Sequence, residues 1–524
     1  MIKHIYLISI DALRFDCVGS HKKDKLFNSK YSVLLDTPTL NYLVSKSINF
    51  TQTTTAAPYT SASHASIFTG LYPPKHNVRA LLNPGDQSLA KNVLTLAEIF
   101  ASEGFKTLYA SDEESMTCPL NVDRGFKYYF QNNDKRLINY IQRNKNEKLF
   151  IFKHFFDVHD PYLLTRYKYN SNVNDDLELL LKKKADEEHI SFSKSDSIYD
   201  KWRKIYGGTN NNREELLPLY LKGVSKFDKG RFKLFIDSLR KIGEFNNSLF
   251  IFFSDHSEGR CNSNNLNFFA HGGELYDEVM RVPLYIYHKK LMKRQIMKQT
   301  SLVDIFPTVL DIVFNNKQFL KPRYKINGLS LLDDKQNHKF TYAEFWRSDK
   351  EHPQDYPTNK NWLLCQRVIR TSKSKLLLFG QPENIASTSF SNLDINDVNK
   401  FLMCKFSDIK INFIDKANVV EYINQFLTDM NSQIIKFYDL EKDPKENNSI
   451  NINGKKRSFK IKILSKYFIN LIYKIDEPNI SFQSQALMEK IPYLKSIYNS
   501  SIYKQKPTVS SIISNLFIYI FNLI

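Results

Sequence analysis

The sequence predicts an α/β fold in which a central, mostly parallel sheet is flanked by helices. The first observation is a set of three near-continuous apolar runs, at residues 5–10, 149–156 and 248–254. Such runs are typical of strands buried on both faces, as in parallel sheets covered by helices. The second is helical patterning between them, at 94–100 and 228–242. With 524 residues, 42% of them hydrophobic, the chain can bury a large core in more than one domain.

Each apolar run is followed by side chains that can bind a metal or transfer a proton. Asp11 follows the first run, Asp157 and His159 follow the second, and Asp255 and His256 follow the third. Ligands of parallel sheets bind at the carboxyl ends of the strands. A single carboxylate in this place could equally cap a helix or a turn. Three strands that end in this way favour a functional site.

The segment 57–70 places Thr60 where a helix is predicted to begin, after a run of extended Thr residues. Backbone N–H groups at a helix start lack partners and carry partial positive charge, so they would stabilise an alkoxide and attract an anionic ester. A hydroxyl residue here is also an ordinary N-cap, and the nucleophile interpretation therefore depends on the other segments.

Taken together, these segments resemble the sulfatase family of the alkaline phosphatase superfamily, over roughly residues 1–450. The resemblance implies an alkaline-phosphatase-like sandwich with a small α+β C-terminal domain. It also implies a metal-dependent hydrolase or transferase of sulfate or phosphate esters. The matching segments, in family order, are 7–16, 60–70, 254–258, 271–284, 303–308 and 437–444.

Two departures from the family pattern change the expected chemistry. Sulfatases proper make formylglycine from the first residue of a Cys/Ser-x-Pro-x-Arg motif, whereas the aligned segment here runs from Thr60 to His64, and none of the five cysteines lies in such a motif. A Thr nucleophile resembles instead the phosphodiesterases, phosphonate hydrolases and phospho-group transferases of the superfamily, which form a covalent intermediate. Ala12 stands where many sulfatases carry a second metal-binding Asp.

The predicted metal ligands are Asp11, Thr60, Asp255 and His256. Their mixture of oxygen and imidazole donors favours zinc or manganese, with calcium or magnesium as alternatives. A divalent ion bound to Thr60 would lower the pKa of its hydroxyl and polarise the phosphoryl oxygen.

Several histidines near the strand ends are the predicted catalytic and substrate-binding groups. We expect His159 and His271 to hold the phosphoryl oxygens or to protonate the leaving group, and His64 to bind substrate near the nucleophile. A second ion held by Asp157, His159 and His271 is the alternative to a mononuclear site. His154 falls inside a predicted strand, and we expect a structural role for it.

The pattern along the chain predicts three parts: a catalytic domain at 1–340 with a polar insertion at 165–215, a small antiparallel domain at 341–450, and a basic tail at 451–524. The tail holds 11 Lys and Arg against 3 Asp and Glu. Its apolar end, 509–524, is too short to span a bilayer. It is predicted either to lie on an anionic membrane as an interfacial helix or to dock on the core.

The net charge of +19 is compatible with a nucleic-acid partner, but no nucleic-acid motif appears and we expect none. The first strand begins within the first ten residues, and the five cysteines form no disulfide framework. We therefore expect a cytoplasmic protein, peripheral at the inner face of the membrane if the tail binds lipid. The expected substrate is a small molecule or a surface-glycan precursor that carries a phosphate or sulfate ester. The alternatives are a sulfuric ester hydrolase without formylglycine and a catalytically silent glycan- or membrane-binding relative.

Overall fold

The computed structural model divides the chain into two compact units, residues 1–361 and 362–524. The first unit ends later than the predicted boundary near 340, and its last strand is β13 (Thr341–Ser348). The predicted tail at 451–524, with its apolar end, lies outside the described residues. These are 2–21, 29–79, 88–164, 175–207, 213–263, 266–272, 275–314, 326–333, 338, 340–348, 363–380 and 435–446.

The first unit is built on an eight-stranded sheet with the order β11-β2-β10-β7-β1-β6-β4-β5. The five strands from β7 to β5 run parallel, and β10 is antiparallel to both of its neighbours. The prediction of a mostly parallel central sheet is confirmed. The strands are β1 (His4–Ile10), β2 (Ile48–Phe50), β4 (Lys106–Ser111), β5 (Tyr128–Tyr129), β6 (Leu149–Phe155), β7 (Leu249–Phe253), β10 (Leu284–Tyr287) and β11 (Arg294–Ile296).

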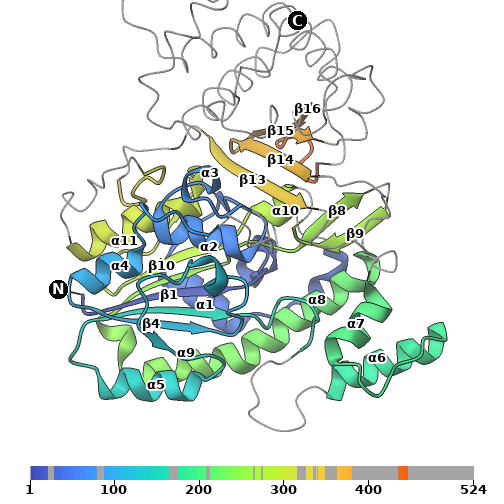
Figure 1. Ribbon diagram of the computed structural model, residues 1–524, viewed down its shortest axis with the longest axis horizontal. Helices are drawn as coiled ribbons and strands as arrows, with labels where there is room; N and C mark the ends of the chain where they lie inside the picture. The colour runs from blue at the N-terminus through green and yellow to red at the C-terminus, as the bar shows by residue number, and fades with distance from the viewer. Residues whose placement is uncertain are drawn as a thin grey trace, which may run out of the picture. The chain divides into compact units, whose positions relative to one another are not determined.

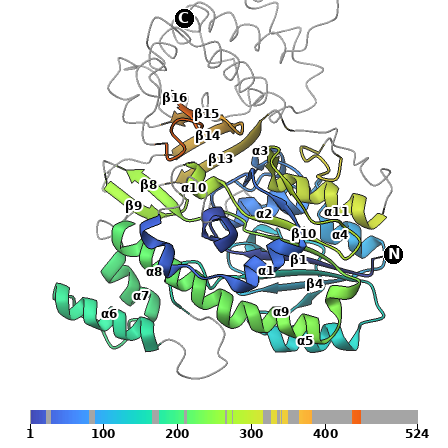
Figure 2. The ribbon, with the colours of Figure 1, turned by 180° about the vertical axis from the view of Figure 1, so that it is seen from behind.

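Helices cover both faces of this sheet (Figure 1 and Figure 2). On one face, Tyr6 and Ile8 of β1 belong to a core cluster with α1 (Pro38–Lys46), α5 (Asp134–Arg143), α8 (Arg213–Phe227) and α9 (Lys233–Lys241). On the other face, Phe150 of β6 stacks on Phe100 and Phe152 packs edge-to-face on Phe68. Ile151, which lies between these two phenylalanines, belongs to the first cluster, so successive residues of β6 point into two different layers of the protein. The helices of the second layer are α2 (Thr60–Thr69), α4 (Leu96–Ser102) and α11 (Ile305–Phe314).

The predicted polar insertion contains α6 (Asp175–Glu188) and α7 (Ile198–Tyr206). In the second unit, β14 (Leu363–Arg370), β15 (Ser374–Gly380) and β16 (Ile435–Asp439) form an antiparallel sheet. None of the helices in the described ranges is both long enough and apolar enough to cross a membrane. The short elements of the first unit are α3 (Pro73–His76), α10 (Asp277–Met280), β3 (Thr53–Thr54), β12 (Thr300–Ser301) and the β8 (Gly259–Ser263) and β9 (Leu266–Ala270) pair.

Candidate active site

The carboxyl ends of three neighbouring strands bring together side chains that are far apart in the sequence. β1 lies between β6 and β7, and all three strands run parallel. Asp11 follows β1 directly, and Asp255 is the second residue after β7. Asp11 is held in place because its N–H donates to the carbonyl oxygen of Phe155 at the end of β6. Ala12 adopts a left-handed conformation (φ 56°), and its N–H donates to Asp255 Oδ1 at 3.4 Å.

Thr60 is the first residue of α2, and its side chain is only 4% exposed. Its hydroxyl donates to Asp11 Oδ2 at 3.3 Å and lies 3.3 Å from His256 Nε2. The N-cap residue of the helix is Tyr59, which makes no side-chain capping hydrogen bond. The N-cap side chain therefore does not occupy the first turn of α2, and a helix start of this kind favours an anionic group nearby.

The three predicted metal ligands other than Thr60 form a compact group. One donor atom from each of Asp11, Asp255 and His256 lies within 4.8 Å of the other two. His256 Nε2 is 3.4 Å from Asp11 Oδ1 and 3.5 Å from Asp255 Oδ2, and all three residues are buried. Neither of these two carboxylate oxygens accepts a hydrogen bond from any described residue. A buried oxygen without a donor is costly, so the donor set fits a divalent cation of the zinc or manganese type.

The charges of the two carboxylates support this fit. Burial by itself would raise the pKa of Asp11, but His154, His256 and His159 hold it well below its usual range. Burial and the charge of Asp11 raise the pKa of Asp255 to about 7. Two carboxylates that cannot easily ionise together are stabilised as a pair when a cation lies between them.

His159 and His271, the two histidines expected to act on the ester, lie beside this group. The His271 ring stacks on the His256 ring with centroids 4.5 Å apart, and the His159 ring packs edge-on against the His271 ring at 4.7 Å. Burial opposes the charged form of His159, but Asp160, Asp11 and Glu258 outweigh it and raise its pKa to about 10. His159 is therefore an imidazolium at neutral pH, which suits it to hold anionic oxygens rather than a metal.

Glu258 is a residue of the site to which sequence reasoning gave no role. Its Oε1 lies 2.8 Å from His271 Nδ1, which fixes the His271 ring and leaves Nε2 as the nitrogen available to a substrate. Burial opposes the charged form of His271, but the Glu258 charge and hydrogen bond raise its pKa. The signal in the sequence was the spacing of Glu258 only two residues from His256.

His154 was predicted to have a structural role, and its position in the structure argues against that interpretation. Its Nε2 lies 3.1 Å from Asp11 Oδ2. It pairs in register with Ser9, and the His64 ring packs edge-on against it with centroids 4.7 Å apart. His64 is fully buried, with Nε2 3.2 Å from Ser9 Oγ and 3.8 Å from Asp255 Oδ2. Burial and the nearby His154 hold the pKa of His64 well below its usual range, so it is neutral.

Asp157 lies away from the predicted second ion. Its Oδ2 accepts a hydrogen bond from Arg231 Nη1 at 2.7 Å, on the face of the sheet that α5 and α9 cover. A carboxylate that is already paired with a buried guanidinium is a poor ligand for an ion between His159 and His271. The alternative of a second ion on Asp157, His159 and His271 therefore has no support from this geometry.

The comparisons with known proteins agree with this architecture. A sequence model of the Sulfatase family matches residues 3–315. The chain is 23% identical over 448 residues to an arylsulfatase of Clostridium perfringens, which covers 73% of this chain and 86% of the relative. It is 24% identical over 305 residues to an ulvan-active sulfatase of Formosa agariphila, over 53% of this chain and 56% of the relative.

Solved structures share the fold at lower sequence identity. One is a Bacteroides thetaiotaomicron sulfatase from a study of the metabolism of multiple glycosaminoglycans, with TM-score 0.58 and 16% identity, over 94% of this chain and all of that chain. Another was solved with its substrate D-glucosamine-2-N,6-O-disulfate, with TM-score 0.56 and 17% identity, over 92% of this chain and all of that chain.

Proposed function

The chain belongs to the Sulfatase family and is a sulfatase-like ester hydrolase, and from this premise we propose that it acts on phosphate esters or phosphonates through a covalent intermediate on Thr60. The observation that carries the proposal is the position of the Thr60 hydroxyl. It lies at the start of α2, 3.3 Å from both Asp11 Oδ2 and His256 Nε2. The sequence resemblance aligns Thr60 with the formylglycine position of sulfatases proper.

The roles of the residues follow from their charges and positions. Asp11, Thr60, Asp255 and His256 would hold a divalent ion, zinc or manganese by their donor types, which when bound lowers the pKa of the hydroxyl and polarises the ester. Thr60 Oγ1 attacks phosphorus and forms a new P–O bond, while the bond to the leaving-group oxygen breaks. Asp11 accepts the hydrogen bond of that hydroxyl and so orients it, while the proton that the metal-bound hydroxyl would lose passes to solvent.

The two histidines next to the metal ligands complete the reaction. His159, charged at neutral pH, holds a non-bridging oxygen of the ester. His271, positioned by Glu258, donates a proton from Nε2 to the departing oxygen. Water or a second alcohol then attacks the Thr60 ester and releases the hydroxyl, so the same site can act as a hydrolase or as a transferase.

A sulfuric ester hydrolase is the second candidate, because the curated relatives described above are named as sulfatases. The Thr60 hydroxyl could attack sulfur in the same position without formylglycine. Under either candidate we propose a glycan as the carrier of the ester. The similarity in fold to a structure that contains a disulfated glucosamine gives this choice its support.

The test is a panel of aryl phosphodiesters, aryl phosphonates and aryl sulfates, assayed with metal-reconstituted full-length protein. We expect the phosphodiester or phosphonate to be cleaved fastest, and mass spectrometry of acid-quenched enzyme to find the transferred group on the peptide that contains Thr60. A strong sulfatase rate without a phosphodiesterase rate would favour the second candidate. No turnover on any ester would favour the silent binding protein.

A further inference from the structure

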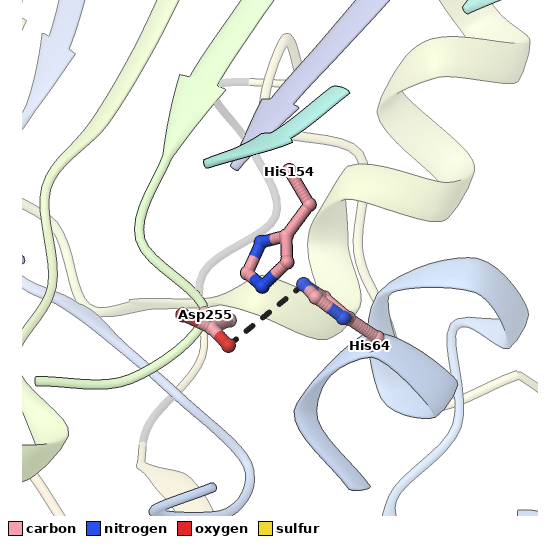
Figure 3. Close-up of side chains that lie close together, drawn as sticks. All are labelled: His64, His154 and Asp255. Atoms are coloured by element: carbon pink, nitrogen blue, oxygen red, sulfur yellow. Dashed lines mark ion pairs between the residues drawn. The ribbon is translucent and has the colours of Figure 1, made fainter. Parts of the chain in front are cut away.

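A second group of metal-ligating side chains lies beside the first. It consists of His64 from α2, His154 from β6 and Asp255 from the turn after β7, which point toward one another (Figure 3). One donor atom from each lies within 4.8 Å of the other two, and all three residues are buried. Three separate elements of the fold hold these side chains, so the convergence does not depend on one mobile loop.

We propose that His64, His154 and Asp255 bind a second divalent ion of the zinc type, with Asp255 shared between the two ions. Two imidazole nitrogens and one carboxylate are the ligands of many catalytic zinc sites, which keep a fourth position for water or a substrate oxygen. The inference rests on the proposed function for its first ion. It adds a binuclear centre whose second ion lies on the α2 side of the sheet, rather than beside His159 and His271.

The distances are compatible with a shared carboxylate. Asp255 Oδ2 lies 3.8 Å from His64 Nε2 on one side and 3.5 Å from His256 Nε2 on the other. Bonds of about 2.0–2.1 Å in a tetrahedral site place neighbouring donors roughly 3.3–3.5 Å apart. The Asp255–His64 pair would therefore have to close by only about 0.3–0.5 Å to share an ion, and the donor atoms of all three residues lie within 4.8 Å of one another. Two-metal hydrolytic sites hold their ions about 3.5–4 Å apart, a spacing that one bridging carboxylate can span.

The hydrogen bonding of other buried histidines supports the inference. His4 uses both ring nitrogens, with Glu244 Oε2 at 2.7 Å and the Glu147 carbonyl oxygen at 3.2 Å. His76 also uses both, with Ser66 Oγ at 2.8 Å and the Val78 N–H at 3.2 Å. These two are satisfied as structural histidines are expected to be.

His64 and His154 differ from that pattern. Nδ1 of each ring is buried and has no hydrogen-bond partner among the described residues, and the same is true of Asp255 Oδ2. A ring whose Nε2 binds an ion keeps a proton on Nδ1, which a water molecule or a small adjustment can satisfy. Of the atoms that would face the ion, Asp255 Oδ2 is the one without a partner in the described parts of the chain. His64 Nε2 lies 3.2 Å from Ser9 Oγ, and His154 Nε2 lies 3.1 Å from Asp11 Oδ2. The inference therefore rests on a buried carboxylate oxygen without a donor that lies beside two imidazole nitrogens.

The competing arrangement is a neutral His64 that is held by Ser9. Ser9 Oγ lies 3.2 Å from His64 Nε2 and can donate a hydrogen bond to it. In that case His64 orients the start of α2, Asp255 serves the first ion alone, and the protein binds one ion. The two arrangements therefore differ in metal stoichiometry.

The experiment measures zinc equivalents in full-length protein that has been stripped with a chelator, reloaded with Zn²⁺ and passed through a desalting column. We expect two equivalents in the wild type and one in His64→Gln and in His154→Gln. His76→Gln is the matched control, because it alters a buried histidine that contacts α2 without facing a carboxylate, and it should keep two equivalents. Circular dichroism of each variant establishes that it is folded.

The outcomes separate this inference from the proposed function. Saturation of the wild type at one equivalent overturns the second site, even if the variants fail to fold, and so does a folded His64→Gln that keeps two. Two equivalents in the wild type with loss of one in His64→Gln support it, whether or not any ester is cleaved. An active enzyme with a single ion would retain the proposed function and refute the binuclear centre.

Discussion

Two buried polar clusters lie on opposite faces of the sheet at the end of β6. Neighbouring residues of that strand contribute a side chain to each cluster. Lys153 points toward the layer of α5 and α9, whereas His154 points toward α2. We call the first the Arg231 cluster (Asp112, Asp134, Lys153, Asp157 and Arg231) and the second the Thr60 cluster (Asp11, Thr60, His64, His154, Asp255 and His256). Both are almost completely hidden from solvent.

The Arg231 cluster is paired throughout. Arg231 contacts Asp112, Asp134 and Asp157 at 2.6–2.8 Å. Lys153 Nζ lies 2.6 Å from Asp112 Oδ1 and 3.1 Å from Asp134 Oδ1. The guanidinium comes from the π-helical segment Asp228–Phe232, which places it over the strand ends. Buried charges with this geometry hold elements in register. Among the buried polar atoms without a hydrogen-bond partner in the described residues, none belongs to this cluster.

The Thr60 cluster has the opposite character. Its contacts between charged or ligating atoms are mostly 3.1–3.8 Å, and five of its ring nitrogens and carboxylate oxygens have no hydrogen-bond partner in the described parts of the chain. Burial and charge are common to both clusters and therefore do not by themselves identify a site. The informative feature is a buried polar group that the protein itself leaves incomplete.

The largest effect should come from removing the nucleophile of the Thr60 cluster. Thr60→Val keeps the shape of the side chain and should reduce kcat/KM by a factor on the order of 10³ or more, about 4 kcal/mol of transition-state stabilisation. The melting temperature should stay within a few degrees of the wild type. Thr69→Val, at the other end of α2, is the control and should keep nearly full activity. Comparable kinetics for the two variants would remove Thr60 from the reaction.

Breaking the Arg231 cluster should affect stability instead. Arg231→Met leaves three buried carboxylates without their guanidinium, and we expect a loss of about 3–5 kcal/mol in the free energy of unfolding. Urea denaturation at pH 7 measures it. Arg240→Met, an exposed arginine whose ion pair is with Asp237, should change stability by less than about 1 kcal/mol. Equal stabilities would show that the Arg231 cluster does not hold the fold together.

Asp255→Asn tests whether the Thr60 cluster binds a cation. Its effect on folding stability should have opposite signs in the absence and in the presence of metal. The pKa of Asp255 in the folded protein is raised to about 7, so the metal-free native state binds a proton more tightly than the unfolded chain. Its contribution to stability is present below the unfolded pKa, about 3.9, and is lost as pH rises through 7. In chelator, the wild type should therefore lose more stability than Asp255→Asn between pH 5 and 8, on the order of 1 kcal/mol or more.

With Zn²⁺ present, the order of these two proteins should reverse at pH 8, because ion binding stabilises only the wild type. Thermal melting in chelator and in zinc, at both pH values, gives the comparison. If the stability difference between the two proteins changed with neither metal nor pH, a cation site at Asp255 would be contradicted.

The sequence allowed Asp11, Asp255 and His256 to be predicted because each follows an apolar run, and the carboxyl ends of parallel strands share one edge. It could not separate Lys153 from His154, since alternation along a strand shows that they face opposite sides but not which side carries α2. Asp157 pairs with Arg231 instead of facing the metal ligands. Arg231 lies 74 residues further along the chain and has no periodic relation to Asp157, so the sequence pattern could not predict this pairing. Glu258 was visible only as a neighbour of His256. The local sequence pattern therefore located the strand ends. The roles of the residues there depend on contacts with side chains from distant parts of the sequence, which the pattern does not show.

The smallest expected effect concerns the hydrogen bond between Glu258 and His271 Nδ1, at the edge of the Thr60 cluster. Burial alone would lower the pKa of His271, and the charge and hydrogen bond of Glu258 raise it. Glu258→Gln keeps a hydrogen-bonding side chain but removes the charge, so the pKa of His271 should fall. If protonated His271 donates to the leaving group, the alkaline limb of the pH profile of kcat/KM should move down by about one pH unit. Activity near pH 6 should change by less than about tenfold.

The leaving group provides the control for this last prediction. A substrate with a strongly acidic leaving alcohol needs no proton, so its alkaline limb should be insensitive to Glu258→Gln. A shift that is the same for good and poor leaving groups would assign the titration to another residue, and an unchanged profile would mean that Glu258 only packs against the His271 ring. Because Glu258 acts through His271, the pH profile distinguishes positioning from a merely structural contact in a way that a single rate cannot.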